Sequence, residues 1–236
     1  MSKVGKILVI IPAYNEEASI GRVIEEVRQH LSEADILVVN DGSSDSTSSA
    51  ARKKEALVLD LPYNLGIGGA VQTGCRYAFQ HGYEFALRLD GDGQHYPQEG
   101  SKVLSPLLKG EADIVVGSRF ISKEGYKSTF LRRMGIRFFS LVIRLITGGN
   151  IKDPTSGFNG FNRTGIELIS SKYSADYPEV EALIIARKRG LRIKEVPVIM
   201  KRRKKGKSSI DYLEAIYYMI KVSLSTFIGH FKKVKH

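Results

Sequence analysis

The chain has 236 residues, of which 42% are hydrophobic and 26% charged, as expected for a globular protein with a proper core. A single cysteine, Cys75, excludes an internal disulfide and a cysteine-based zinc cluster, and it is compatible with a reducing compartment. No run of about 18 to 20 apolar residues predicts a transmembrane helix, and the run at 7–11 is too short for a secretion signal, so a cytoplasmic location is expected.

The net charge of +11 is unevenly distributed. Residues 1–118 hold 11 basic and 16 acidic side chains, whereas residues 119–236 hold 25 basic and 9 acidic ones. Six of the seven residues at 201–207 are basic. This asymmetry indicates a polyanionic partner, either a nucleic acid, an anionic membrane or a phosphorylated substrate, and the alternative is that the lysines only confer solubility.

The first half alternates apolar runs with amphipathic stretches, the pattern of a mostly parallel sheet flanked by helices. The predicted strands are 6–11, 36–39, 56–60, 85–89 and 113–117. The predicted helices in this half are 18–31, 45–54 and 68–80. Repeats and low-complexity linkers are absent from the sequence, which favours one compact α/β domain with a C-terminal extension.

Three predicted strands are followed by polar sequences, namely PAYNEE after the first, NDGSSDST after the second and DGDGQH after Leu89. In an open α/β sheet the ligand lies beyond the carboxyl ends of the strands, so we expect the three loops to meet in one site. NDGSSDST also has the composition of a helix start, with Ser44 or Asp45 as N-cap. A helix start does not explain Asp41, which stands directly at the strand end.

Asp90 and Asp92 are two residues apart at the end of an apolar strand. Like charges this close are tolerated when a cation lies between them or when one of them is protonated. Carboxylates in this arrangement suit Mg²⁺ or Mn²⁺, with Gln94 or His95 completing the shell. An EF-hand is excluded because its glycine and distal glutamate are missing, and a surface Asp-Gly turn is the alternative.

The segment NLGIGGAVQTG at 64–74 is rich in glycine and opens a predicted helix. It fits a phosphate cradle at a helix N-terminus. It fits equally well a tight turn followed by close helix packing, because the spacing matches neither a Walker loop nor a Rossmann fingerprint.

Taken in order, PAYNEE, VVNDGSSDST, NLGIGGAVQTG, LDGDGQH, GSRF, DPTSGF and RRKKGKSSI resemble the motifs of family 2 inverting glycosyltransferases with the GT-A fold. The chain is similar in particular to dolichyl- or polyprenyl-phosphate sugar synthases, of the dolichol-phosphate mannose synthase type. The resemblance implies a GT-A catalytic domain at 1–209, divided into a nucleotide- and metal-binding half at 1–118 and an acceptor half at 119–209. The QxxRW signature of processive polysaccharide synthases is missing, so transfer of a single sugar is expected.

The resemblance also implies roles for individual residues. The residues that would hold the nucleoside of the donor are Pro12, Tyr14, Glu16 and Asp41. Those that would bind a divalent metal, Mg²⁺ or Mn²⁺, at the donor diphosphate are Asp90, Asp92 and Gln94. Those that would close over the diphosphate are Arg203, with Arg202 as the alternative, Lys207 and Ser208. Those that would bind the lipid phosphate are Arg119 and Arg133, and catalysis is assigned to Asp92, Arg119 and Arg203.

The expected reaction moves one hexose from UDP-glucose, UDP-N-acetylglucosamine or GDP-mannose to polyprenyl phosphate with inversion. A phosphate monoester is largely ionised near neutral pH, because its second pKa is about 6, so this acceptor needs no strong protein base. A glycan or glycolipid hydroxyl is the alternative acceptor and would need a base, for which Asp92, Asp153 and Glu179 are candidates. A module that binds polyanions without catalysis is a remote alternative, and no nucleic-acid partner is expected.

Two stretches predict helices that lie at a membrane interface. In 131–147 one stripe holds the polar residues Arg133, Arg137, Ser140, Arg144 and Thr147. The remaining surface holds the apolar residues Phe138, Phe139, Leu141, Val142, Leu145 and Ile146. The segment 210–236 has a similar polar stripe and a basic tail. We therefore expect a peripheral protein on an anionic surface, at the inner face of the cell membrane, with a small membrane protein and a second copy of the chain as further candidate partners.

Overall fold

The computed structural model describes residues 5–121, 130–171 and 178–201, with the side chains of 130–133 left out. The strands are β1 Ile7–Ala13, β2 Ala34–Asn40, β3 Leu57–Asp60, β4 Phe85–Arg88, β5 Ile114–Ser118, β6 Asn159–Asn162 and β7 Ile193–Pro197. The helices are α1 Ile20–His30, α2 Thr47–Lys53, α3 Gly66–Gln80, the short 3₁₀ helix η1 Pro97–Glu99, α4 Gly100–Leu108, α5 Phe130–Thr147, α6 Arg163–Ser171 and α7 Pro178–Lys188. None of the helices within this described part of the chain is long and apolar enough to cross a membrane.

The described strands form one seven-stranded sheet in the order β3-β2-β1-β4-β6-β5-β7. Every neighbouring pair is parallel except those of β6, which runs antiparallel to both β4 and β5. The predicted mostly parallel sheet is therefore confirmed, and the five predicted strands match β1 to β5 within about two residues at each end. Because β7 pairs with β5, the second half of the chain completes the sheet begun by the first half.

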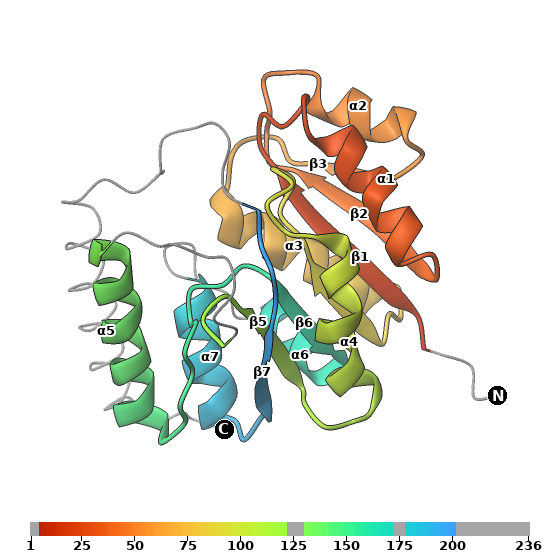
Figure 1. Cartoon of the computed structure of the whole chain (residues 1–236). Coiled ribbons are helices and arrows are strands. Elements are labelled where there is room, and N and C mark those ends of the chain that lie inside the picture. Colours follow the sequence, from red (N-terminus) through yellow and green to blue (C-terminus); the bar gives the residue numbers. More distant parts are fainter. Residues whose placement is uncertain (1–4, 122–129, 172–177, 202–236) are drawn as a thin grey trace.

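Helices cover both faces of the sheet (Figure 1). The side chains of α1, α2 and α4 pack on one face, and those of α3, α5, α6 and α7 pack on the other. Successive residues of β1 alternate between the two cores, so Leu8 and Ile10 face α3 while Val9 and Ile11 face α1. Burial on both faces explains why these strands are continuous apolar runs in the sequence.

Glycines allow the close approaches that hold the site-bearing elements together. A Cβ at Gly74 would lie 2.4 Å from Cγ2 of Ile10, so α3 can pack on β1 only with glycine there. Gly42, after β2, has a φ of +70°, and a Cβ there would lie 2.7 Å from the carbonyl carbon of Tyr63. The packing interpretation of the glycine-rich segment is thus supported, whereas its role as a phosphate cradle stays a prediction.

Helix α2 begins two residues later than predicted. Ser46, not Ser44 or Asp45, occupies the N-cap position, and its side chain makes no capping hydrogen bond. Oδ1 of Asp45 instead accepts a hydrogen bond of 2.9 Å from the backbone N–H of Thr47. Asp45, one residue before the N-cap position, therefore satisfies a backbone amide of the first helical turn, as a capping side chain does.

Candidate active site

The loops after β1, β2 and β4 meet at the carboxyl edge of the sheet. The backbone N–H of Asp41 donates to the carbonyl of Ala13 at 2.9 Å, and that of Gly91 donates to the carbonyl of Pro12 at 3.3 Å. The end of β1 thus contacts both neighbouring loops, because β1 lies between β2 and β4 in the sheet. The predicted convergence of the three polar loops is confirmed.

Asp41 lies almost buried at the end of β2, with 3% of its surface exposed. Its Oδ1 accepts a hydrogen bond of 2.7 Å from the backbone N–H of Leu65. Burial raises the pKa of Asp41, although the backbone N–H groups of Leu65 and Gly66 act in the opposite direction. The carboxylate therefore ties the loop after β2 to the start of α3, and its contact with a nucleoside stays a prediction.

Large apolar side chains are exposed at the loop ends around Asp41. They are Tyr14, Tyr63, Leu65 and Ile67. Exposed aromatic and aliphatic groups beside a buried carboxylate are suited to packing against a flat nucleobase. The sequence-based prediction included Tyr14 but not Tyr63 or Leu65. These two could have been noticed as apolar residues in a loop that is otherwise rich in glycine and asparagine.

The remaining predicted nucleoside residues have local partners. Pro12 is buried in β1, and its carbonyl is bonded to Gly91. The backbone N–H of Glu16 donates to Oγ1 of Thr47 at 2.8 Å, and its carboxylate accepts a hydrogen bond of 2.5 Å from the hydroxyl of Ser19. Glu16 therefore joins the starts of α1 and α2, and its role toward a ligand is not tested.

Arg88 compensates part of the negative charge at the end of β4. Its buried guanidinium lies 3.3 Å from Oδ1 of Asp90 and 2.6 Å from Oε1 of Glu179 on α7. Burial acts to raise the pKa of Asp90, but the surrounding charges, of which that of Arg88 is the largest, and the hydrogen bond from Arg88 together outweigh burial, so this pKa is lowered and the carboxylate is ionised. The sequence did not indicate that Arg88 pairs with Asp90, or that Glu179 pairs with Arg88.

His95 is buried and contacts the loop that follows β4. Its Nδ1 accepts a hydrogen bond of 3.1 Å from the backbone N–H of Asp90, and its ring stacks on Phe158 with 4.9 Å between centroids. Burial lowers the pKa of His95, even though the charge of Asp90 raises it. A neutral imidazole that accepts at Nδ1 carries its proton on Nε2, and this nitrogen lies 3.7 Å from Oδ2 of Asp90.

The residues present fit a hard divalent cation. Oδ1 of Asp92 accepts a hydrogen bond of 2.9 Å from the backbone N–H of Gln94, whose side-chain amide also donates to Oδ2. No group of three or more His, Cys, Asp and Glu side chains is arranged to hold a metal within residues 5–121, 130–171 and 178–201. Two carboxylates, with substrate phosphates and water as the other ligands, are a common way to bind Mg²⁺, and Asp90 and Asp92 are the pair that would do so.

The DPTSGF sequence, residues 153–158, packs against the loop that contains Asp90 and Asp92. The hydroxyl of Ser156 donates to the carbonyl of Gly117 at 2.6 Å, which fixes the segment to the end of β5. A Cβ at Gly157 would lie 2.9 Å from Nη2 of Arg88 and 3.1 Å from Oδ2 of Asp90, so only glycine lets the chain pass this pair. This motif therefore supports the loop that contains the predicted metal ligands, and the sequence alone did not indicate that contact.

Arg119 is held by Asp153 in the interior. Its Nε and Nη2 donate to the two carboxylate oxygens at 2.7 and 2.6 Å, and its backbone N–H donates to Oδ2 at 3.0 Å. The side chains are 6% and 0% exposed. Glu195 of β7 accepts the backbone N–H groups of Lys152 and Asp153, and burial raises the pKa of Glu195. A lipid phosphate bound by Arg119 would have to share its guanidinium with Asp153.

The residues between β7 and the basic segment 201–207 lie against the loop that contains Asp90 and Asp92. Met200 forms an antiparallel bridge with His95, and the backbone N–H of Lys201 donates to the carbonyl of Gln94 at 2.8 Å. The ammonium of Lys201 lies 3.3 Å from Glu26 and 4.6 Å from the ring centroid of Tyr96. The run of basic residues at 201–207 thus begins beside the predicted metal ligands.

A family model for "Glycosyl transferase family 2" matches residues 8–169, which include every loop described above up to DPTSGF. The chain belongs to glycosyl transferase family 2. The enzyme is 32% identical, over 81% of its length and 84% of the relative, to the UDP-N-acetylglucosamine--dolichyl-phosphate N-acetylglucosaminyltransferase of Methanococcus voltae. It is 30% identical, over 87% of its length and 88% of the relative, to the undecaprenyl-phosphate mannosyltransferase of Micrococcus luteus. The resemblance inferred from the motifs is confirmed.

The glycosyltransferase also shares its fold with solved structures. One is glucosyl-3-phosphoglycerate synthase from Mycobacterium tuberculosis in complex with Mn²⁺, UDP and glucosyl-3-phosphoglycerate. The superposition has a TM-score of 0.71 at 22% identity and covers 96% of this chain and 80% of the other. The predicted GT-A fold is confirmed by this similarity.

Several predicted site residues of the glycosyltransferase lie outside the described residues. They are Arg203, its alternative Arg202, Lys207 and Ser208. Arg133 lies in α5, but its side chain is also outside that part. The predicted helix and basic tail at 210–236 fall there too.

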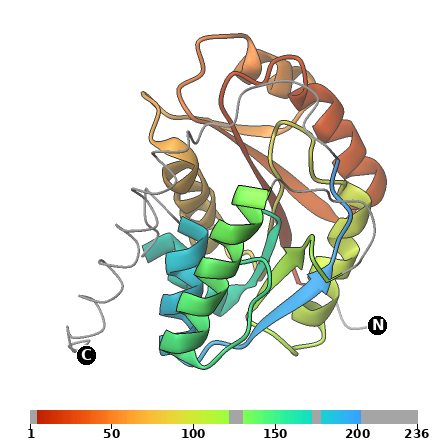
Figure 2. The same cartoon turned by 60° about the vertical axis from the view of Figure 1, so that its left-hand side comes forward.

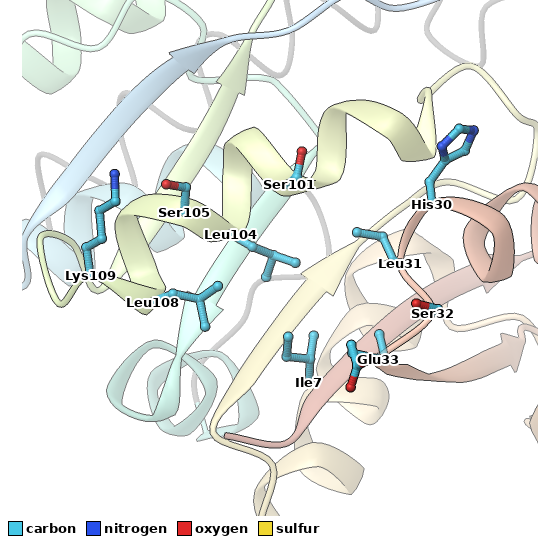
Figure 3. A pocket seen from close by; sticks show the side chains of 11 residues that line it. Ile7, His30, Leu31, Ser32, Glu33, Ser101, Leu104, Ser105, Leu108 and Lys109 are labelled. Carbon is cyan, nitrogen blue, oxygen red and sulfur yellow. The ribbon is translucent and has the colours of Figure 1, made fainter. Parts of the chain in front are cut away.

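A groove of about 390 Å³ lies at the opposite end of the sheet from the acidic loops (Figure 3). It opens between the end of α1 and one side of α4, and its residues include Leu31, Leu104 and Leu108. Ile7 lines it at the start of β1, whereas the candidate active site begins at Pro12, about 17 Å further along the strand. The groove is therefore separate from the candidate active site.

Proposed function

We propose that this enzyme transfers one hexose from a nucleotide sugar to polyprenyl phosphate, with inversion and with the help of a divalent metal. Relatives that cover most of the chain are named for transfer to dolichyl phosphate and undecaprenyl phosphate. The chain lacks a QxxRW signature, in keeping with transfer of a single sugar. The sugar and the nucleotide base follow from a few hydrogen bonds and are left to the experiment below.

The choice of a phosphate as the acceptor rests on the contacts of two candidate bases, Asp153 and Glu179, each of which already binds an arginine. Asp153 is fully buried and binds Arg119 through both oxygens, and Glu179 binds Arg88. A carboxylate whose oxygens already hold a buried guanidinium is poorly placed to take a proton from an acceptor hydroxyl, because that step would break the buried ion pair. A hydroxyl acceptor would thus depend on Asp92 alone, whereas a phosphate acceptor needs no base.

Donor binding is assigned to the three loops at the carboxyl edge. Asp41 and Tyr14, with Pro12 and Glu16 behind them, would hold the nucleoside. Asp90 and Asp92, with Gln94 beside them, would hold Mg²⁺ or Mn²⁺. The bound ion would neutralise charge on the donor diphosphate and so make it a better leaving group.

The proposed reaction is a single displacement at the anomeric carbon. An oxygen of the lipid phosphate forms a bond to this carbon while the bond to the diphosphate oxygen breaks. The electron pair leaves with the nucleoside diphosphate, and no proton has to be removed from the ionised acceptor. The basic residues after Lys201, in particular Arg203 and Lys207, would stabilise the charge that develops on the leaving oxygens.

The lipid acceptor requires a membrane surface, and we propose that the enzyme works as a peripheral protein at the cytoplasmic face. Arg133 would bind the lipid phosphate. For Arg119 the buried contact with Asp153 favours a positioning role, in which the guanidinium fixes the loop between α5 and β6 beside the acceptor.

The test is transfer by the purified full-length chain from each labelled donor in turn, with undecaprenyl phosphate or undecaprenol as acceptor in detergent and with Mg²⁺ or Mn²⁺. We expect label in the organic phase from one donor, with the phosphate only, and its loss in Asp92→Ala. The matched control is Asp35→Ala, which removes a carboxylate at the far end of β2 and should keep the activity. Label on undecaprenol and not on undecaprenyl phosphate would replace this proposal by the hydroxyl-acceptor reaction.

A further inference from the structure

Arg88 is a buried charge on an inner strand of the sheet. It is the last residue of β4, which has strands on both sides, and its side chain is 3% exposed. Its register partner on β1 is the core residue Ile10. A charge taken out of water costs free energy unless specific partners compensate it. The reason for an arginine at this position therefore lies in what its guanidinium contacts.

The guanidinium of Arg88 joins two carboxylates from distant parts of the chain. Its Nε donates to Oδ1 of Asp90 at 3.3 Å, and its Nη1 donates to Oε1 of Glu179 on α7 at 2.6 Å. Separate nitrogens hold the two carboxylates, which the planar fork of arginine allows. A lysine ammonium is a single point charge and does not reproduce this geometry.

Glu179 gives Arg88 a fixed anchor. It belongs to the first turn of α7, which packs in the core through Val180 and Leu183. Figure 2 shows α7 beside α5, on the other side of the sheet from α4. The Glu179 side chain is 15% exposed, so solvent screens this ion pair only weakly. The position of the guanidinium is therefore set by the fold of the second half of the chain.

The contact with Arg88 orients Asp90 and still leaves it open to a cation. Arg88 occupies Oδ1, and Oδ2 lies 3.7 Å from Nε2 of His95. Gly157 passes the pair closely, since even a Cβ there would lie 2.9 Å from Nη2 of Arg88. The Asp90 side chain nevertheless has 30% of its surface exposed. Outer contacts of this kind fix the direction of metal-ligating side chains, and they are worth about 10–100-fold in metal affinity.

We propose that Arg88 is a positioning residue, which holds Asp90 in the direction that binds the divalent metal and is itself held by Glu179. The proposal rests on the proposed function, because it takes the metal site at Asp90 and Asp92 from there. Charge alone would act in the opposite direction, since a cation 3.3 Å from a metal ligand repels the metal ion. The sign of the change in metal affinity therefore separates positioning from charge repulsion.

The test measures Mn²⁺ binding directly by electron paramagnetic resonance, in which the signal of free Mn²⁺ falls as the ion binds. The full-length chain is titrated with Mn²⁺ in the presence of UDP or of GDP. Arg88→Lys keeps the positive charge but loses the fork, and we expect it to bind Mn²⁺ at least roughly tenfold more weakly than the wild type.

The matched control is Arg192→Lys. Arg192 pairs with Asp113 at 2.9 Å, and the two residues directly precede β7 and β5, at the opposite edge of the sheet from the loop with Asp90. The same exchange of arginine for lysine should leave the Mn²⁺ affinity at the wild-type value there. A loss of affinity in both variants would show that the effect is not specific to Arg88 and would overturn the proposal.

A double variant separates positioning from folding. Arg88→Met/Glu179→Leu removes both charges of the buried pair, so it should unfold in urea at a higher concentration than Arg88→Met alone. Its Mn²⁺ affinity should stay at least roughly tenfold below that of the wild type, because Arg88 no longer holds Asp90. If the folded double variant binds Mn²⁺ like the wild type, the pair serves the fold alone and the proposal is overturned.

Two other results would also count against the proposal, and they are distinguishable from each other. Equal or tighter Mn²⁺ binding by Arg88→Lys, with normal binding by the wild type, would remove the role of Arg88 and leave the proposed function standing. If the wild type binds no Mn²⁺ with either nucleotide, the metal assignment of the proposed function fails, and the positioning of Asp90 for a metal fails with it.

Discussion

The substitution Asp153→Asn removes the charge that holds Arg119 in the interior and so separates a structural role of this pair from a role in binding substrate. The two side chains are 6% and 0% exposed and share hydrogen bonds of 2.6 and 2.7 Å. Removal of one partner from a buried ion pair costs about 3–5 kcal/mol, because the other charge stays in the interior without compensation. A domain of this kind is stable by about 5–15 kcal/mol, so the variant should fold but with much of its stability lost.

The assay is urea unfolding followed by circular dichroism and extrapolated to zero denaturant. The double variant Arg119→Met/Asp153→Leu should recover most of the lost free energy of unfolding, because it leaves no unpaired charge. The matched control is Glu111→Gln, which breaks an exposed ion pair of 2.7 Å with Lys194 and should unfold at the wild-type urea concentration. A loss below about 1 kcal/mol in Asp153→Asn, together with loss of sugar transfer, would refute the reasoning and assign Arg119 to the substrate.

Three further predictions concern the loop of the predicted metal ligands, the packing of α3 and the response to acid. Lys201→Met removes the contacts with Glu26 and Tyr96 and should weaken the binding of the nucleoside diphosphate, UDP or GDP, with Mn²⁺ roughly threefold in calorimetry. Unchanged binding would show that these contacts do not position the loop. Gly74→Val, whose Cβ meets Ile10 at 2.4 Å, should lose about 1–3 kcal/mol in urea unfolding, and no loss would mean that α3 can shift. The hydrogen bond from Arg192 lowers the pKa of Asp113 to about 2. The stability that this pair contributes above about pH 4 should therefore be lost as the pH falls toward 2. If Asp113→Asn unfolds with acid at the same pH as the wild type, this prediction is contradicted.

The sheet and the meeting of the loops were predictable because both depend on local patterns. Strands buried on two faces are continuous apolar runs, and β1, β2, β4 and β5 have this signature, while the partly exposed edge strand β3 is a short apolar run as well. The carboxyl ends of parallel strands lie at one edge, so the positions of Asp41 and Asp90 followed from the strand boundaries alone. The strands β6, with the sequence NGFN, and β7, with the sequence IKEVP, carry no such pattern and were missed.

The partners of the buried charges were not predictable in the same way. Arg119 and Asp153 are 34 residues apart in the sequence, and Arg88 and Glu179 are 91 apart. Such pairs form because tertiary packing removes them from water together, and no local spacing encodes that. The sequence therefore indicated Asp153 and Glu179 as free candidate bases, whereas the structure places an arginine on each. The amphipathicity of α5 was visible in the sequence, but only the fold shows that Phe139 is a core residue and not, as predicted, part of the exposed apolar surface.

The measurement that most directly tests the account is calorimetric titration of UDP and of GDP into the full-length chain, with Mn²⁺ or with EDTA. The account predicts that one nucleotide binds only when Mn²⁺ is present, that Asp92→Ala abolishes this binding and that Asp41→Ala weakens it, while Asp35→Ala binds like the wild type. Binding of equal strength in EDTA, or binding unchanged in both Asp92→Ala and Asp41→Ala, would contradict the claim that the loops after β1, β2 and β4 form the donor site.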